Sequence, residues 1–342
     1  MKRPLSMIGT LVSALLLSAC GNGEDPAWQA YHRTLEDALN AAPIAREAPS
    51  NIGAFPARRE RLLDVPEIRE SMLNVYALRE CDITSLVAAR NNQLGRVAPP
   101  SQHWLYEREL WQRLERCSQS DIAEGLGEND RARLLNLTEL KTEQLPAVGF
   151  NALFDSEEWE KNFSRASQPL ELTALPDMAR ELDALGYLKT MVLNTYSLEW
   201  QADSATLEHH LKALQARPLT AEVLRTLLLA AKRLEEANRL LANHLPTNNL
   251  PTTNLPAAQC LPPWQNDGLA NMALAARRWL GAVNALIDAH EVEAPTAVAD
   301  YQRRWLSLET INAPWPRFEA ALMEHLALRT AYPVCALDQG VD

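Results

Sequence analysis

The side chains best suited to chemistry in this 342-residue sequence cluster between positions 90 and 107. A guanidinium, two amides, a phenol and a carboxylate occur there: Arg90, Asn91, Gln102, Tyr106 and Glu107. Such groups, when brought together, can neutralise and hydrogen-bond an anionic or sugar-like ligand. We therefore treat these five residues as a candidate ligand-binding site.

The same segment also has a purely structural interpretation. Asn91 tolerates the backbone conformation at the end of a helix, and Gly95 allows a turn. Ser101 is typical of a helix start, because its hydroxyl oxygen can accept the first backbone amide hydrogens. Arg90 and Glu107 could then form an ion pair between two helices, and the cluster would serve the scaffold alone.

No catalytic or metal-binding pattern stands out elsewhere in the sequence. Ser101 would need a base to act as a nucleophile, and nearby His103 would point in a different direction on a helix. The seven histidines and five cysteines show neither HExxH nor CxxC spacing, so we expect no metal. With only 12 glycines, loops that hold cofactor phosphates are poorly supplied, so we expect no cofactor and favour a protein that is not an enzyme.

Short motifs around the candidate site follow one another in a recognisable order. They are Cys81, ARN at 89–91, LG at 94–95, PSQ at 100–102, YE at 106–107 and Cys117. This order resembles the domain-of-unknown-function family numbered 3080, whose members are bacterial proteins. The resemblance covers most of the chain but is specific only over these motifs, and it implies no activity and no catalytic residue.

The composition excludes several classes of protein. Hydrophobic residues make up 47% and charged residues 23% of the chain, which is typical of a globular protein with a sizeable core. Lys and Arg total 33 against 44 Asp and Glu, which gives a net charge of −11. A domain that binds nucleic acid is usually basic, so we expect no nucleic-acid partner.

Residues 1–19 have the features of a bacterial signal peptide. Lys2 and Arg3 form a positively charged start, and the apolar run that follows is too short to span a bilayer. The tetrapeptide at 17–20 reads LSAC, which resembles the lipobox of bacterial lipoproteins. The resemblance implies cleavage before Cys20, a diacylglycerol on its thiol and a further acyl chain on its amino group. Several acyl chains make a stable membrane anchor.

Residues 20–26 would then form the lipidated cysteine and a short tether. Gly21 and Asn22 follow Cys20 where Asp would signal retention in the inner membrane, and this resembles the outer-membrane pattern. We therefore expect a lipid anchor on the periplasmic face of the outer membrane rather than the inner membrane. At about 3.3–3.6 Å per residue the tether is short, so the folded part would lie close to the membrane.

Four cysteines remain once Cys20 is assigned to lipid: Cys81, Cys117, Cys260 and Cys335. In an oxidising periplasm an even set of cysteines favours disulfides, and three pairings are possible. We prefer Cys81 with Cys117, which joins the helices on either side of the turn at 91–101, and Cys260 with Cys335. Buried free thiols remain the alternative.

The rest of the chain has the period of amphipathic helices. Apolar residues recur three and four positions apart. Helices are expected over 26–42, 64–79, 82–92, from Ser101 past Leu114, and over 128–144, 157–165, 176–200, 220–245, 268–289 and 316–331. No convincing strand pattern appears. We therefore predict an all-α fold, an irregular multi-helix bundle after a lipoprotein signal peptide. Residues 27–342 are expected to form a single helical domain, with a subdivision near 246–264 left open because Leu-Pro steps there prevent a helix.

Two functional hypotheses follow. The first, which the anchor and the lack of a catalytic pattern favour, is a lipid-anchored periplasmic helical protein that acts in envelope structure or through an unidentified envelope protein partner. The second is a periplasmic ligand-binding protein or enzyme that acts on glycan or lipid through the cluster at 90–107. The two differ in whether these side chains converge on a cavity.

Overall fold

The computed structural model describes residues 26–173, 175, 177–245 and 260–335. Within these ranges the regular elements are all helices, and a single isolated parallel bridge joins Leu261 to Val334. The all-α prediction is therefore confirmed. The expected signal peptide, Cys20 and most of the tether lie outside the described residues, as do 246–259 of the Leu-Pro segment.

Eight longer helices make up most of the described chain. They are α1 (Pro26–Leu39), α6 (Pro100–Ser118), α8 (Glu128–Phe154), α10 (Ala179–Leu193), α11 (Ser204–Gln215), α12 (Leu219–Asn243), α13 (Asp267–Ile287) and α15 (Pro314–Thr330). The shorter elements are α2 (Arg58–Arg61), α3 (Met72–Ala77), η1 (Arg79–Cys81), α4 (Thr84–Asn91), α5 (Gln93–Arg96), α7 (Asp121–Gly125), α9 (Glu157–Lys161), α14 (Thr296–Tyr301) and η2 (Gln302–Leu306). The helices predicted over 26–42, 220–245, 268–289 and 316–331 correspond closely to α1, α12, α13 and α15.

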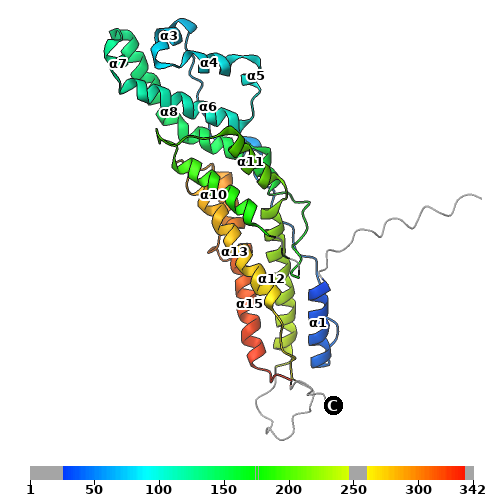
Figure 1. The fold of residues 1–342 in the computed structure, drawn as a ribbon. Coiled ribbons are helices and arrows are strands. Elements are labelled where there is room, and N and C mark those ends of the chain that lie inside the picture. Colours follow the sequence, from blue (N-terminus) through cyan, green and yellow to red (C-terminus); the bar gives the residue numbers. More distant parts are fainter. Residues whose placement is uncertain (1–25, 174, 176, 246–259, 336–342) are drawn as a thin grey trace, which may run out of the picture.

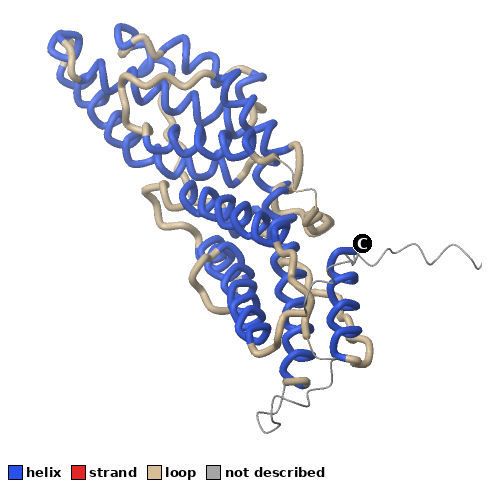
Figure 2. The backbone as a smooth tube through the Cα atoms, turned by 60° about the horizontal axis from the view of Figure 1, so that its bottom comes forward, coloured by secondary structure: helices blue, strands red, loops and turns tan. Residues whose placement is uncertain are grey.

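The helices form an elongated molecule (Figure 1). At one end α6 packs on α8 with α3, α4 and α5 above them, and at the other end α12 packs on α15 with α1 alongside. Helices α10, α11 and α13 connect the two ends, as the turned view also shows (Figure 2). Two ends that are far apart in space can therefore hold independent sites.

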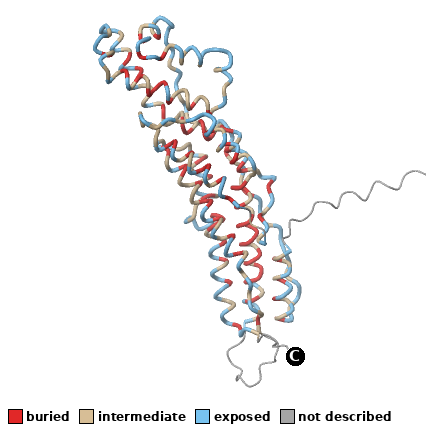
Figure 3. Tube along the Cα trace, viewed as in Figure 1, coloured by how far each residue is buried: buried red, intermediate tan, exposed pale blue. Residues whose placement is uncertain are grey.

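The buried residues run along the inside of this arrangement (Figure 3). The main hydrophobic core includes Trp104, Trp159 and Trp279, and α12 contributes the largest continuous stripe to it. Two smaller clusters lie apart from it, one around Leu110 and Leu114 and the other around α1, the end of α12 and Leu261. Small clusters bury little apolar surface, so each needs further support.

A disulfide lies at each of these smaller clusters. Cys81 pairs with Cys117, and both are members of the first cluster. Cys260 pairs with Cys335, and the neighbouring Leu261 of the second cluster forms its bridge with Val334. The preferred pairing is therefore confirmed. Each crosslink removes freedom from the unfolded chain and stabilises the fold where its apolar core is smallest.

The predicted helix over 64–79 is wrong in its first half. Residues 62–71 are not helical, and α3 begins only after Ser71, whose hydroxyl accepts a hydrogen bond from the amide of Asn74 at 3.2 Å. The side chain of Asn151 on α8 instead holds the backbone of Leu63, with two hydrogen bonds of 2.8 Å. Tertiary contacts therefore keep this segment extended across α8.

Helix α8 is longer than the predicted 128–144, because it continues through Pro146 to Phe154. Proline has no N–H, so the helix cannot supply a donor to the carbonyl of Thr142 four residues earlier. The Tyr196 hydroxyl donates to that carbonyl at 3.0 Å. A side chain from a distant loop thus replaces the missing helical hydrogen bond.

Helix α10 is shorter than the predicted 176–200, and a loop follows it from residue 194. Buried Arg108 on α6 donates to three carbonyls of this loop, those of Asn194, Ser197 and Trp200, at 2.7–3.4 Å. Burial lowers the pKa of Arg108 to about 10, which leaves the guanidinium charged at neutral pH. These bonds satisfy carbonyl groups that a continued helix would otherwise have paired.

Candidate ligand-binding cavity

A cavity of about 710 Å³ lies between α6, α8 and the segment from Val65 to Arg96. Four of the five predicted residues line it. Arg90 and Asn91 come from the end of α4, and Tyr106 and Glu107 come from α6. Its volume falls within the range of about 300–1,000 Å³ that is usual for small-molecule sites.

The lining of this cavity combines apolar and charged side chains. The apolar side chains, from α3, α4, α6 and α8 and the segments before α3 and α4, include Val75, Ile83, Val87, Leu110, Leu114 and Leu137. The charged ones are Glu67, Arg69, Glu70, Arg90, Arg96, Glu107 and Lys141. A ligand with both an apolar and a charged part would therefore find matching surfaces.

Arg90 is held at the edge of the cavity by its neighbours. Its Nη1 donates to the carbonyl of Gly95 at 3.2 Å, and its guanidinium lies 5.9 Å from the centre of the Tyr106 ring. The side chain of Asn92 caps α5 by accepting the amide of Gly95 at 2.8 Å. A Cβ at position 95 would lie only 2.3 Å from the carbonyl oxygen of Ala89, so only glycine fits this close approach.

Glu107 pairs with Lys141 on α8 and not with Arg90. The carboxylate lies 2.5 Å from Nζ of Lys141, and both side chains are mostly buried. The expected pair between Arg90 and Glu107 is therefore wrong, because α8 brings a cation of its own to α6. Burial and the nearby Glu107 charge raise the pKa of Tyr106, so its hydroxyl stays protonated and can donate.

Two cations at this cavity have no carboxylate partner in the described part of the chain. Arg69 is paired with Glu67 at 2.7 Å, and Lys141 is paired with Glu107. Arg90 and the exposed Arg96 make no ion pair there, although Arg90 contacts the Gly95 carbonyl. An anionic group on a ligand would complete the pairing of these charges.

The structure does not bring Gln102 into this group. Its amide nitrogen donates to Glu208 and Ser204 on α11, both at 2.9 Å. The hydroxyl of Ser101 donates to the same Glu208 carboxylate at 2.7 Å. The expectation that Ser101 caps α6 is therefore wrong, because it lies inside the helix and faces α11, while Pro99 occupies the cap position.

A second pocket of about 420 Å³ adjoins the cavity on the other side of Arg90 and Glu107. Its lining includes His103 and the ion pair between Arg58 and Asp155. Burial, assisted by the charge of Arg90, lowers the pKa of His103, which favours a neutral ring. The two spaces share the same pair of charged residues, so a ligand could extend from one into the other.

Sequence reasoning missed Arg96, Lys141 and the segment 65–70. Arg96 follows Gly95 directly and could have been added to the cluster from the sequence. Lys141 lies on a helix that shows no polar motif, and 65–70 was expected to be helical. Their places depend on how α8 packs against α6.

The chain matches a known family over residues 28–262, a stretch that includes both disulfide-linked elements of the cavity and the whole of α12. The chain belongs to this family. Its description is "Protein of unknown function (DUF3080)", and the resemblance inferred from the motifs is thus confirmed. Searches of curated proteins and of solved structures found no match to the chain.

Further observations bear on where this family member operates. The two disulfides are consistent with an oxidising, extracytoplasmic compartment. None of the described helices is both long enough and apolar enough to cross a membrane. Within the same described ranges, no group of His, Cys, Asp and Glu side chains is arranged to hold a metal ion.

Proposed function

We propose that this protein is a lipid-anchored periplasmic protein that binds an anionic, partly apolar ligand between α4, α6 and α8. The observation that carries the proposal is the convergence of Arg90, Asn91, Tyr106 and Glu107 on one cavity. Convergence on a cavity is the feature that distinguishes the ligand-binding hypothesis from the purely structural one. The observed convergence therefore favours ligand binding.

The charges and the apolar wall of the cavity define the ligand class. Arg90 and Arg96 offer positive charge without a carboxylate partner in the described chain, which favours a carboxylate or phosphate group on the ligand. The wall around Leu110, Leu114 and Leu137 offers apolar surface, and burial there contributes about 25 cal/mol per Å². A lipid-like anion satisfies both requirements better than a sugar does.

The lipid anchor rests on the sequence at positions 17–20 and on the position of α1. Helix α1 begins at Pro26, six residues after Cys20, so an anchor there would hold the folded part close to a membrane. The residues after Cys20 favour the outer membrane. A membrane surface would also be a ready source of lipid-like ligands.

Isothermal titration calorimetry tests the cavity. In this experiment dodecanoate is titrated into a chain that starts at Pro26. We expect saturable binding, with weaker binding of dodecanol, which has the same chain but no charge. Arg96→Gln should weaken dodecanoate binding by up to about fivefold, because an ion pair of an exposed side chain contributes at most about 1 kcal/mol. Arg131→Gln on exposed α8 surface is the matched control and should change nothing.

Two outcomes would contradict the proposal. One is the absence of saturable dodecanoate binding, and the other is equal affinity in Arg96→Gln and Arg131→Gln. Gln102→Ala adds a further check, since the structure places Gln102 against α11 and not in the cavity. That variant should bind dodecanoate with unchanged affinity.

A further inference from the structure

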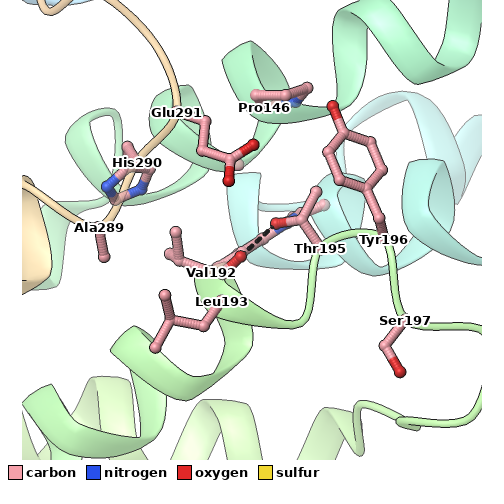
Figure 4. Close-up of a pocket in the computed structure, with 11 residues that line it drawn as sticks. Pro146, Val192, Leu193, Thr195, Tyr196, Ser197, Ala289, His290 and Glu291 are labelled. Carbon is pink, nitrogen blue, oxygen red and sulfur yellow. Dashed lines mark hydrogen bonds between the residues drawn. The ribbon is translucent and has the colours of Figure 1, made fainter.

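A smaller cavity of about 110 Å³ lies in the middle of the molecule and shares no residue with the first (Figure 4). It is formed by α6 and α8, the loop after α10 and the residues that follow α13. Trp104 and Gly149 contribute to its wall, and Tyr196, His290 and Glu291 surround it. Nothing in the proposed function uses this space.

Two polar atoms at this cavity are buried without a hydrogen-bond partner in the part of the chain that the structure describes. They are Nε1 of Trp104, in a residue that is 2% exposed, and Nε2 of His290, in a residue that is 9% exposed. Trp104 Nε1 lies at the cavity wall, because a Cβ on Gly149 would be only 3.1 Å away from it. Buried polar groups are nearly always satisfied, so two at one cavity indicate a missing partner.

The two atoms have opposite hydrogen-bonding roles. The indole Nε1 carries a hydrogen and can only donate. Nδ1 of His290 lies 3.1 Å from the carbonyl oxygen of Leu286 and donates to it, which leaves Nε2 of the neutral ring as an acceptor. Burial lowers the pKa of His290, so the ring is neutral at neutral pH. The backbone groups of Leu286, Ile287 and Gly149 partly oppose this lowering, and Nε2 has no hydrogen-bond partner of good geometry among the described residues.

The electrostatics of the cavity favour a cation and oppose an anion. The lining holds no lysine or arginine, and Glu291 makes no ion pair among the described residues. Figure 4 shows its carboxylate facing Tyr196 across the space. Helices α10 and α13 both end at this cavity, and helix C-termini carry partial negative charge. Arg108 binds carbonyls of the loop after α10, but it does not line the cavity.

We propose that this cavity binds a small hydroxylated amine of the size of ethanolamine. The ammonium group donates to the Glu291 carboxylate and to Nε2 of His290, and the hydroxyl oxygen accepts from Nε1 of Trp104. The Tyr196 ring lies beside the cation, where an aromatic face attracts positive charge. Such a ligand satisfies both buried atoms and the carboxylate at once, which neither an anion nor a simple hydrocarbon can do.

Calorimetric titration of the full chain in detergent with ethanolamine at pH 7 tests this inference, with acetate as the anionic comparison. We expect saturable binding of ethanolamine and none of acetate. Glu291→Gln should weaken ethanolamine binding by up to about fivefold, because Glu291 is exposed and such an ion pair contributes at most about 1 kcal/mol. Glu293→Gln is the matched control, because Glu293 is also exposed, lies two residues away and does not line the cavity.

A second variant and an NMR signal show whether a loss of ethanolamine binding reflects the cavity or misfolding of the variant. Gly149→Ala places a methyl group against the Trp104 indole and should abolish ethanolamine binding, with a thermal melt to confirm folding. The indole N–H signal of Trp104, assigned with Trp104→Phe, should shift on titration in the NMR spectrum. Three results would each overturn the inference and show that the cavity holds only water. They are the absence of saturable ethanolamine binding, the binding of acetate, and equal ethanolamine affinity in Glu291→Gln and Glu293→Gln.

Discussion

At the scale of single residues, the role of each polar side chain depends on what folds against it. Arg90 and Gln102 belong to one sequence cluster, yet one lines the cavity and the other joins α6 to α11. His325 is the reverse case, since no motif marks it. It is completely buried, with Nδ1 at 2.7 Å from Oδ1 of Asn238 and Nε2 bonded to the Tyr31 hydroxyl.

This buried histidine predicts that stability falls in acid. Burial lowers the pKa of His325 to about 3, whereas an unfolded histidine titrates near pH 6.5. Only the unfolded state therefore takes up this proton as the pH falls from about 6.5. The free energy of unfolding should then be lower by about 2 kcal/mol at pH 5 than at pH 7. Urea unfolding at pH 7 and pH 5 should show this loss. His325→Gln should reduce this difference in unfolding free energy between pH 7 and pH 5. His209→Gln, at an exposed site, is the control and should leave the difference unchanged. Equal pH dependence in the two variants would contradict the assignment of the effect to His325.

At the scale of elements, most of the long helices and the short helices α4 and α9 were predictable, whereas α11 and most of the other short helices were not. The apolar stripes of α12 and α13 lie within one continuous segment each, so their period is visible in the sequence. The segment 62–71 had a plausible helix signal, but its side-chain and backbone contacts with α8 hold it extended. Helices α3, α4 and α5 are short, and tertiary contacts and the Cys81–Cys117 disulfide set their places.

This disulfide predicts a local effect on the ligand cavity. Removing it with Cys81→Ala and Cys117→Ala should cost about 3–4 kcal/mol on the chain-entropy estimate for its 36-residue separation. It should also speed hydrogen exchange in α3 to α5 and weaken dodecanoate binding. The matched pair Cys260→Ala and Cys335→Ala lies at the other end and should leave dodecanoate affinity unchanged. Equal loss of binding in both pairs would show that the effect is global.

At the scale of the whole molecule, the elongated bundle separates the two cavities from helix α1. The ligand cavity lies at the α3–α8 end, whereas α1, which follows the proposed anchor, lies beside α12 towards the other end (Figure 1). The smaller cavity between α8, α10 and α13 lies between them. A ligand in either cavity is thus bound by residues that the anchor does not involve.

The anchor itself predicts covalent lipid on one cysteine. In bacterial cells that make the full chain and are grown with a clickable palmitate analogue, the chain should be labelled, because we propose that the pattern at 17–20 directs acylation of Cys20. Cys20→Ser should lose the label. Cys117→Ser is the matched control and should keep it, since Cys117 is bound to Cys81 in the folded protein. Retained label in Cys20→Ser would refute the anchor.

The sequence by itself determined that the chain is helical, where helices such as α12 and α13 run and which family it belongs to, because helix periodicity and short motifs are local properties of the chain. Only the tertiary structure decided which polar residues meet. Lys141 pairs with Glu107 from another helix, Glu208 accepts a hydrogen bond from Gln102 away from the cavity, and His290 and Trp104 line one small cavity although they are far apart in the sequence. These contacts depend on how helices distant in sequence pack, and no local pattern encodes that.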